Sequence, residues 1–312
     1  MDFESRRQRI LDKMEDNSIA ILYSGIEHHV SADEYDLFTA QANRNFFYLT
    51  GLRRDNMVLV LDKYVEPAKT MLFIEEADPT MERWYGRKVT MEEAEEISGI
   101  DEIEYIYELE STLDRIMTRE DVYTAYFDTY RHQKVDLPDY NVVKANEFKT
   151  DYPGVAVKNL FPLVAEERMQ KDELTKKAIA LTKDGLCNVM ANLKPGMKEY
   201  QAQADFEYII RRGGAEWTAF PTIAGSGMNG TMLHYDTNRE TMEDGTLVLL
   251  DLGARIDGYN SDITRTYPVN GRFTERQKQV YDIVLAANRK IVEVAKPGMT
   301  TKELNEVCKD VL

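Results

Sequence analysis

The sequence predicts two domains, an α/β domain followed by an α+β domain, and three observations support this prediction. The chain has 312 residues, enough for two domains of about 150 residues each, and 43% of its residues are apolar. Short apolar runs alternate with charged helical stretches in the first half. Near Val164 the composition changes to long amphipathic helices. We therefore expect domains of residues 1–164 and 165–312.

The first domain is predicted to contain a mixed sheet with helices between its strands. Residues 19–23 form the first expected strand, because they are all apolar or aromatic. Similar short runs follow at residues 46–49, 57–61 and 71–74, and residues 90–97 have the charge-rich pattern of a helix. Such alternation is typical of an α/β domain.

The second domain contains an internal repeat. One long charged helix is expected over residues 166–190, and residues 194–197, Lys-Pro-Gly-Met, follow it. The same four residues recur at 296–299, and both copies separate amphipathic helices. The repeat predicts two related α/β halves.

Two capping boxes predict where the last helices begin. Thr274 with Gln277, and Thr300 with Glu303, have the spacing at which side chains satisfy the first backbone amides of a helix. The last helix has room for about three turns before Leu312, with no C-cap glycine and no strand after it. We therefore expect the second half of this domain to be cut off.

The composition argues against several classes of protein. The formal net charge of −16 repels phosphate backbones, so nucleic acid is not an expected partner. No apolar run approaches the roughly 18 residues that cross a bilayer, so no membrane span is expected. Residues 1–9 contain both acidic and basic side chains and lead into no apolar segment, which predicts a cytoplasmic location. Cys187 and Cys308 are too few for a disulfide framework.

A hairpin in the second domain brings two aspartates together. An apolar strand ends in Asp251, and Asp257-Gly258 is the strongest two-residue turn signal in the chain. If these two residues form the loop, Gly253 lies opposite Asp262 on the adjacent strand. Asp251 is then the diagonal neighbour of Asp262 and points to the same face of the sheet.

The predicted separation of the two carboxylates suits a metal site. Diagonal β-carbons in a sheet lie roughly 7 to 8 Å apart, and carboxylates at that spacing can hold two divalent ions between them. The same spacing also fits two ordinary surface aspartates on a solvated hairpin. Two features favour the metal site: Asp251 closes a run of four apolar residues, where an unpaired carboxylate is costly, and Asp262 leads into an alternating strand.

The hairpin and four other segments resemble the pita-bread metallopeptidases, in particular the Xaa-Pro aminopeptidases and prolidases. Residues 250–270, LDLGARIDGYNSDITRTYPVN, are similar to the first metal-binding hairpin of that family, and residues 264–288 continue it into the expected helix. Residues 42–51, ANRNFFYLTG, and residues 84–87, WYGR, resemble its N-terminal domain. Residues 224–238, AGSGMNGTMLHYDTN, resemble its substrate-side segment. The resemblance covers nearly the whole chain.

The resemblance implies a fold, an activity and a cofactor. The fold is an α/β N-terminal domain of the creatinase/aminopeptidase P type, followed by the first half of an α+β pita-bread catalytic domain. The activity is hydrolysis of the N-terminal Xaa-Pro bond, by a metal-bridged hydroxide, in peptides with proline as second residue. The cofactor is a pair of divalent metal ions, Mn(II) in most of these enzymes, which suits hard oxygen ligands.

Three residues receive roles from this resemblance. Asp251 is expected to bind one metal ion, Asp262 to bridge two, and His234 to contact the substrate and its oxyanion. Without the resemblance, His234 is more often interpreted as a packing or surface histidine.

The sequence departs from the family in its ligand set. Two octahedral ions need about ten ligand positions, and two carboxylates cannot fill them. The family adds a histidine and two glutamates, but no histidine follows His234 and no matching glutamate motif precedes Leu312. We therefore expect the 312-residue chain alone to have little or no activity, and metal occupancy to be low.

Two further positions bear on specificity and assembly. Phe161 stands where many bacterial members have an arginine that organises the substrate cleft, which affects the expected preference for peptide length. Trp84 matches a residue that reaches the neighbouring subunit in tetrameric relatives, so a homo-oligomer, a dimer or tetramer, is expected. Trp84 fits a half-buried aromatic residue equally well.

Alternative functions remain at this point. A prolidase restricted to dipeptides uses the same chemistry, and a metal-free binding module uses the same fold. Residues 225–230 fit the dinucleotide motif G-x-G-x-x-G, but residues 231–235 alternate like a strand instead of opening a helix. We therefore interpret these glycines as a turn.

Overall fold

The computed structural model describes residues 2–26, 29–31, 34–35, 43–119, 121–130, 139–169 and 173–312, without the side chains of residues 29–31, 34–35, 81, 84 and 85. The chain forms two compact units, Met1–Gln170 and Lys171–Leu312. The sequence analysis placed the boundary near Val164, and the two units divide a few residues later, between Gln170 and Lys171. Each unit has its own core.

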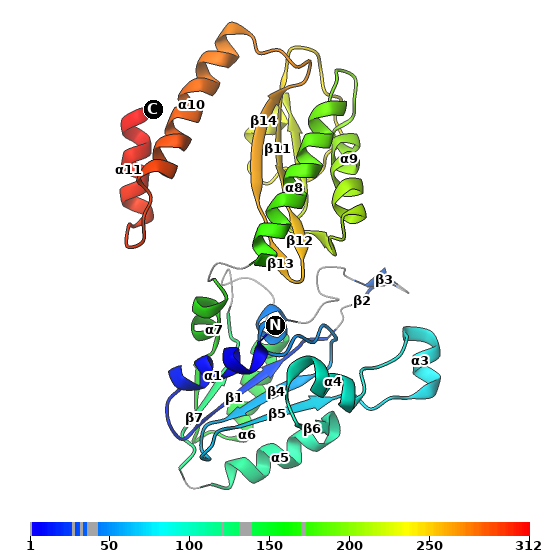
Figure 1. Ribbon diagram of the computed structural model, residues 1–312, viewed down its shortest axis with the longest axis vertical. Helices are drawn as coiled ribbons and strands as arrows, with labels where there is room; N and C mark the ends of the chain where they lie inside the picture. The colour runs from blue at the N-terminus through cyan, green and yellow to red at the C-terminus, as the bar shows by residue number, and fades with distance from the viewer. Residues whose placement is uncertain are drawn as a thin grey trace. The chain divides into compact units, whose positions relative to one another are not determined.

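The first unit contains a six-stranded mixed sheet (Figure 1). Strand β1 is antiparallel to β4 and parallel to β7, and β5 is parallel to β6. The strand order is β6-β5-β4-β1-β7-β8. The strands are β1 (Ser18–Tyr23), β4 (Val58–Asp62), β5 (Lys69–Ile74), β6 (Glu102–Tyr105), β7 (Thr124–Phe127) and β8 (Ala156–Asn159), while β2 (His29–Ser31) and β3 (Glu34–Tyr35) pair separately.

Helices cover both faces of this sheet. Successive residues of β1 and β4 alternate between two cores because side chains of a strand alternate faces. One core is closed by α1 (Phe3–Lys13), α2 (Arg44–Thr50), α4 (Met91–Ser98) and α7 (Phe161–Arg168), and the other by α5 (Leu109–Met117) and α6 (Tyr140–Asp151). The strands are therefore apolar on both faces, as the sequence predicted for residues 19–23, 57–61 and 71–74.

The prediction of a strand at residues 46–49 is wrong, because this run lies within α2. The Asn43 side chain accepts hydrogen bonds from the backbone amides of Asn45 and Phe46 and begins the helix. Gly51 ends it with a φ of +76°. The helix is buried all round, so its apolar residues follow one another without the period of an amphipathic helix.

The long helix expected over residues 166–190 is two helices, α7 and α8 (Glu173–Asn192). Helix α7 belongs to the first unit. Glu167 is 6% exposed and forms ion pairs with Arg9 and Lys13 of α1, at 2.7 Å each. These contacts hold α7 against α1, and α7 ends at Arg168.

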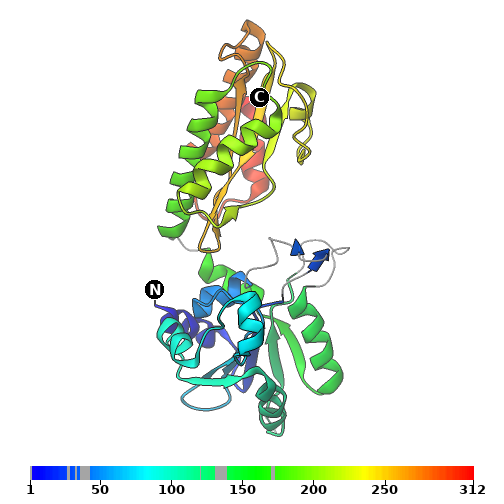
Figure 2. The same cartoon turned by 90° about the vertical axis from the view of Figure 1, so that its right-hand side faces the viewer.

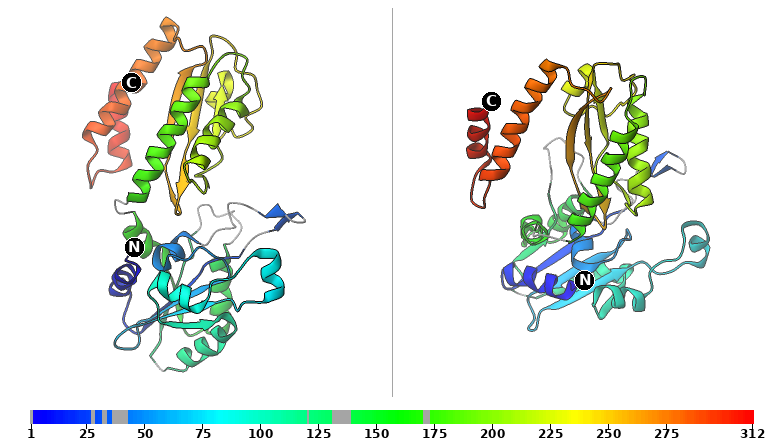
Figure 3. Two further views of the ribbon diagram at one scale, coloured as in Figure 1. Left: turned by 45° about the vertical axis from the view of Figure 1, so that its right-hand side comes forward. Right: turned by 45° about the horizontal axis from the view of Figure 1, so that its top comes forward.

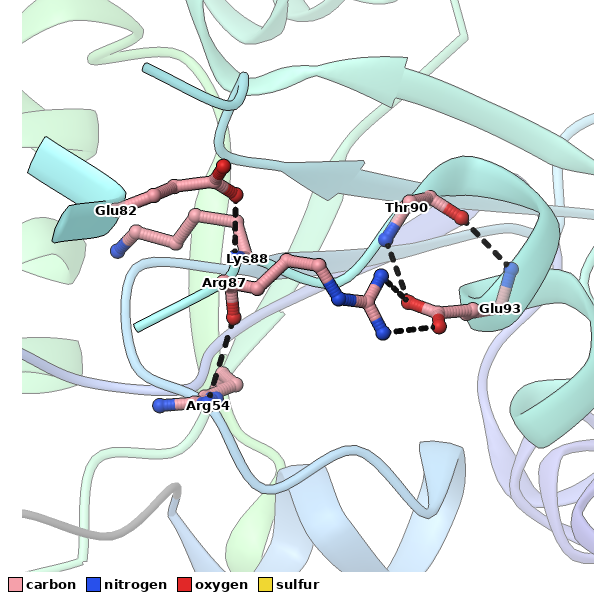
Figure 4. Close-up of polar contacts among 6 residues, drawn as sticks. All are labelled: Arg54, Glu82, Arg87, Lys88, Thr90 and Glu93. Carbon is pink, nitrogen blue, oxygen red and sulfur yellow. Dashed lines mark hydrogen bonds and ion pairs between the residues drawn. The ribbon is translucent and has the colours of Figure 1, made fainter. Parts of the chain in front are cut away.

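The segment between α3 (Pro79–Tyr85) and α4 is fixed by an ion pair (Figure 4). Both guanidinium nitrogens of Arg87 donate to the Glu93 carboxylate, at 2.9 and 2.6 Å. Glu93 also accepts a hydrogen bond from the backbone amide of Thr90 and completes its capping box. The Glu82 carboxylate accepts from the Lys88 amide at 2.8 Å, so both ends of this segment are held.

The second unit packs two helices on one face of a small antiparallel sheet (Figure 2). Helices α8 and α9 (Glu199–Arg212) pack closely against each other. Gly185 of α8 has no side chain, and this allows the close approach of α9. A β-carbon at Gly185 would lie 2.6 Å from the Phe206 ring. The core below them contains Ala224, Val248 and Leu250.

The strands of this unit form two three-stranded sheets, β10-β11-β14 and β13-β12-β9. They are β9 (Trp217–Thr218), β10 (Ile223–Ser226), β11 (Leu247–Leu252), β12 (Ala254–Ile256), β13 (Tyr259–Asn260) and β14 (Ile263–Pro268). Short 3-10 helices occur at η1 (Ile106–Glu108) and η2 (Gly227–Thr231).

The last two helices, α10 (Glu275–Val294) and α11 (Thr301–Val311), lie side by side (Figure 3). Both begin with the predicted capping boxes, at Thr274 and at Thr300. The apolar residues of α10 remain largely exposed, and Ala287 is its one buried residue in the described chain. Within the described ranges, no helix is both long and apolar enough to span a membrane.

Candidate functional site

The hairpin has the register that its turn predicted. Asp257 and Gly258 adopt φ of +52° and +76°, and Ile256 pairs with Tyr259. Two positive φ values are typical of a type I′ turn. Further along, Asp251 pairs with Thr264, which makes Asp262 its diagonal neighbour.

A close backbone approach fixes the crossing of the two strands next to the aspartates. A β-carbon at Gly253 would lie 1.9 Å from the carbonyl oxygen of Ser261, so only glycine fits. Below this point the backbone amide of Ala254 donates to the hydroxyl of Thr182 at 2.8 Å and to that of Ser261 at 3.1 Å. Thr182 lies on α8, so a buried pair of hydroxyls fixes the hairpin to the helix.

The two carboxylates interact directly. Partial desolvation of Asp262, then the charge of Asp251 and a side-chain hydrogen bond with Asp251, raise the pKa of Asp262 above its ordinary value. The hydroxyl of Thr264 donates to Oδ1 of Asp251 at 2.8 Å. Two like charges that share a site favour either a shared proton or a cation between them.

The expectation that Asp251 is buried by its apolar run is wrong. Asp251 is half-buried and Asp262 is exposed. The residues of β11 alternate between buried and half-buried positions, because α8 and α9 cover one face of the sheet and the aspartates lie on the other. Burial of an unpaired charge is therefore the weaker argument for a metal site here. The stronger argument is that the two carboxylates lie close together.

The structure places His234 in an exposed turn after η2. The strand expected over residues 231–235 is wrong, because η2 continues to Thr231 and a turn follows. The glycine motif forms a tight loop, since a β-carbon at Gly225 would lie 2.9 Å from the backbone of Asn229. Among the described residues, no hydrogen bond or ion pair joins His234 to Asp251 or Asp262.

Sequence reasoning missed Glu199, the first residue of α9. Its carboxylate is 0% exposed and accepts five hydrogen bonds from the segment that carries His234. Oε1 accepts from the amide and the hydroxyl of Ser226, at 2.8 Å each, and from the side-chain amide of Asn229 at 3.1 Å. Oε2 accepts from the Tyr235 hydroxyl at 2.7 Å and from the Glu240 amide at 3.0 Å. These partners lie 27 to 41 residues away, so no local pattern points to them.

The hairpin carboxylates fit a divalent cation but do not complete its coordination. Hard oxygen donors of paired aspartates suit such an ion, and a cation between them would relieve their repulsion. In the part of the chain with described coordinates, no group of three or more His, Cys, Asp or Glu residues could hold a metal ion. The pair therefore offers part of a ligand set.

The two residues that bear on specificity and assembly lie in the first unit. Phe161 begins α7, and its ring stacks on Tyr130 with the ring centroids 4.2 Å apart. Trp84 lies on α3, and its side chain falls outside what the structure describes. His28 and His132 also lie outside the described residues.

Comparisons with known proteins assign both units to families. Residues 3–126 match the aminopeptidase P N-terminal domain, and residues 173–312 match metallopeptidase family M24. The Xaa-Pro aminopeptidase of Escherichia coli is 32% identical over 97% of this chain and 70% of its own length. That of Haemophilus influenzae is 30% identical over 98% of this chain and 69% of its own length.

Solved structures show the same similarity. A Bacillus anthracis protein, described as a candidate aminopeptidase P, superposes with a TM-score of 0.92 at 40% identity, over 99% of this chain and 74% of its own. Zinc-substituted E. coli aminopeptidase P in complex with product superposes with a TM-score of 0.86 at 30% identity, over 99% of this chain and 71% of its own.

Proposed function

This chain belongs to the aminopeptidase P family, the Xaa-Pro aminopeptidase type of M24 metallopeptidase, and we propose that it serves the metal-dependent removal of an N-terminal residue that precedes proline. The observation that carries the proposal is the pair Asp251 and Asp262, which interact across adjacent strands at the register that a metal-binding hairpin needs. The peptide substrates follow from the names of the relatives.

The proposed ligands are Asp251 for one ion and Asp262 for two, with Mn(II) as the proposed metal. Carboxylate oxygens suit Mn(II), and the family includes an enzyme that also accepts zinc. When bound, two such ions supply a Lewis acid for the scissile carbonyl and an activated water at neutral pH. The hydroxyl of Thr264 donates to Oδ1 of Asp251 and restricts the orientation of this carboxylate.

His234 is proposed to contact the substrate. Its imidazole is exposed, so it can donate a hydrogen bond from a ring nitrogen to the carbonyl oxygen of the residue before proline. This bond strengthens as the oxygen gains negative charge during attack.

We also propose that the 312-residue chain by itself turns over such peptides slowly or not at all. Two carboxylates leave most coordination positions of two ions to water, and metal affinity falls with the number of protein ligands. Cleavage of longer peptides, not only of dipeptides, follows the aminopeptidase names of the relatives. A homo-oligomer and a cytoplasmic location stay predictions of the sequence.

Metal binding measured by calorimetry tests this proposal. We expect Mn(II) to bind the chain weakly, and we expect Asp262→Asn to lower the affinity at least about tenfold by removing the charge of one ligand. Asp257→Asn is the matched control, because Asp257 lies at the tip of the same hairpin and asparagine tolerates its positive φ. Equal binding by parent and Asp262→Asn would sink the metal assignment. Lack of binding also in a protein that carries the family's further histidine and glutamate ligands would favour the metal-free module.

A peptide-length series then separates the two peptidase alternatives. The series needs a protein in which the histidine and two glutamate ligands of the family are also present. In it, with Mn(II), release of the first residue from a tripeptide with proline second is the expected reaction. Turnover confined to dipeptides would instead make the protein a prolidase.

A further inference from the structure

The Glu199 carboxylate remains charged although the protein covers it. Its five hydrogen-bond donors are all neutral groups, and these hydrogen bonds lower the pKa of Glu199 although burial alone acts to raise it. An ionised carboxylate only accepts hydrogen bonds, which suits a position that faces donors alone. The hydrogen-bonding pattern therefore favours the charged form of Glu199.

The carboxylate joins the two ends of the segment Ser226–Glu240. Ser226, at the end of β10, and Glu240 are bound to opposite oxygens of the same group. The backbone of α9 repeats the connection, because the amide of Glu199 donates to the carbonyl of Glu240 at 3.0 Å. Glu199 thus closes a loop whose length would otherwise leave it many conformations.

The middle of this segment has little apolar packing of its own. Met228 is 79% exposed and Leu233 is 88% exposed. Its conformation therefore depends on polar anchors. The anchor next to His234 is Tyr235, whose hydroxyl donates to Glu199 and accepts from Asn229 at 3.0 Å.

A second anchor holds the segment at a different point. Asn238 is 1% exposed, accepts from the Ala224 amide at 3.0 Å and donates to the Thr222 carbonyl at 2.7 Å. This residue fixes the return of the chain to β10, and none of its hydrogen bonds in the described part of the chain involves the turn of His234. Removal of the Tyr235–Glu199 bond therefore frees the His234 turn while Asn238 keeps the rest of the segment in place.

We propose that Glu199 is a positioning residue for the reaction: through the Tyr235 hydroxyl, its buried carboxylate holds His234 in the orientation in which the imidazole meets the substrate. The inference rests on the proposed function, since it takes His234 as the substrate contact. The hydrogen bonds of Glu199 would then serve the site as well as the stability of the segment.

Histidine NMR on the 312-residue chain tests the proposal directly. The chain has four histidines, and His234→Asn identifies the imidazole signal of His234. In Glu199→Gln we expect this signal to move by more than its line width, because the amide nitrogen that replaces one carboxylate oxygen cannot accept from the donors that it faces. Amide exchange over residues 227–237 should become about tenfold faster or more. The other three histidine signals should stay in place.

Tyr235→Phe removes the hydrogen bond to Glu199 and the one from Asn229, but leaves the other four donors on Glu199, and should shift the His234 signal in the same direction by less. It also carries the test if Glu199→Gln does not fold. A matched control lies on the same helix: Tyr208→Phe loses a hydrogen bond from Arg212. This control should not move the His234 signal. An unchanged His234 signal in both Glu199→Gln and Tyr235→Phe, with only a lower melting temperature, would leave Glu199 a purely structural residue and overturn the proposal.

Titration with the dipeptide alanyl-proline separates this inference from the proposed function. We expect the dipeptide to shift the His234 signal of the parent, with about tenfold weaker apparent affinity in Glu199→Gln. No response in the parent would contradict His234 as substrate contact while the positioning result stands. Equal affinity in parent and variant would contradict the positioning role alone.

Discussion

At the scale of single residues, Gly253 is the position where the site tolerates least change. Gly253→Ala places a β-carbon 1.9 Å from the Ser261 carbonyl oxygen, and backbone cannot move aside as a flexible side chain can. We expect a loss of about 2–4 kcal/mol in the unfolding free energy of the second unit, measured by urea denaturation. Gly154→Ala is the control, since no atom lies within 4 Å of its β-carbon position. Similar effects of both variants would show that the hairpin crossing is not constrained.

A buried ion pair in the first unit gives a second residue-scale prediction. Asp62 is 1% exposed, and its Oδ2 accepts from Arg119 at 2.7 Å. Arg119→Met leaves this charge in the core with the Tyr64 amide as its remaining hydrogen-bond donor among the contacts described here. We expect the free energy of unfolding, measured by urea denaturation, to fall by about 3–5 kcal/mol, because the buried charge of Asp62 loses its ion-pair partner.

The double variant Asp62→Asn/Arg119→Met separates the effect of an unpaired buried charge on stability from the effect of lost side-chain packing. It should recover part of the loss, since no charge remains buried. Arg115→Met, on the exposed side of α5, should change the midpoint little. A double variant as unstable as Arg119→Met would attribute the loss to packing against Tyr64 instead.

At the scale of elements, the pairing of α7 with α1 predicts a dependence on pH. Hydrogen bonds from Lys13 and then Arg9 hold the pKa of Glu167 below its ordinary value of 4.5. A carboxylate with a lowered pKa in the folded state stabilises above its unfolded pKa, and this contribution is lost as the pH falls. The melting temperature of the first unit should therefore fall between about pH 5 and pH 3.

The variant Glu167→Gln isolates this contribution from that of other carboxylates. It should lower the melting temperature at pH 7 and reduce the change between about pH 5 and pH 3. Glu166→Gln is the comparison, because Glu166 also pairs with Lys13 but its side chain is 72% exposed. A pH profile of Glu167→Gln that runs parallel to the parent would contradict the assignment.

The elements also show what the sequence can and cannot predict. The hairpin register followed from Asp257 and Gly258, because a two-residue turn fixes the pairing of every residue behind it. Helix α2 was mistaken for a strand, although Asn43 and Gly51 carry the cap signals that identify a helix. The Glu199 network was missed for another reason. Its partners meet only after the chain has folded, so spacing along the sequence contains no trace of them.

At the scale of the whole molecule, the two units bury their sheets differently. The sheet of the first unit has a core on each face, whereas the second unit has one core under α8 and α9. Helices α10 and α11 contact each other and add little to that core. The paired carboxylates lie on the less covered face of the sheet, which leaves them accessible to ligands and substrate.

The exposed apolar face of α10 predicts concentration-dependent self-association of the chain. Ile283, Val284 and Val292 are 45%, 56% and 73% exposed on one helix, and contiguous exposed apolar surface favours association in water. Light scattering should show a mass that rises with concentration. Ile283→Lys/Val284→Lys should shift this rise to roughly tenfold higher concentration, because two charges on the face must be desolvated when copies meet. Ile179→Lys, at an isolated apolar position on α8 that is 46% exposed, should not. A parent that stays monomeric across the range would mean that α10 is stable in water with this face uncovered.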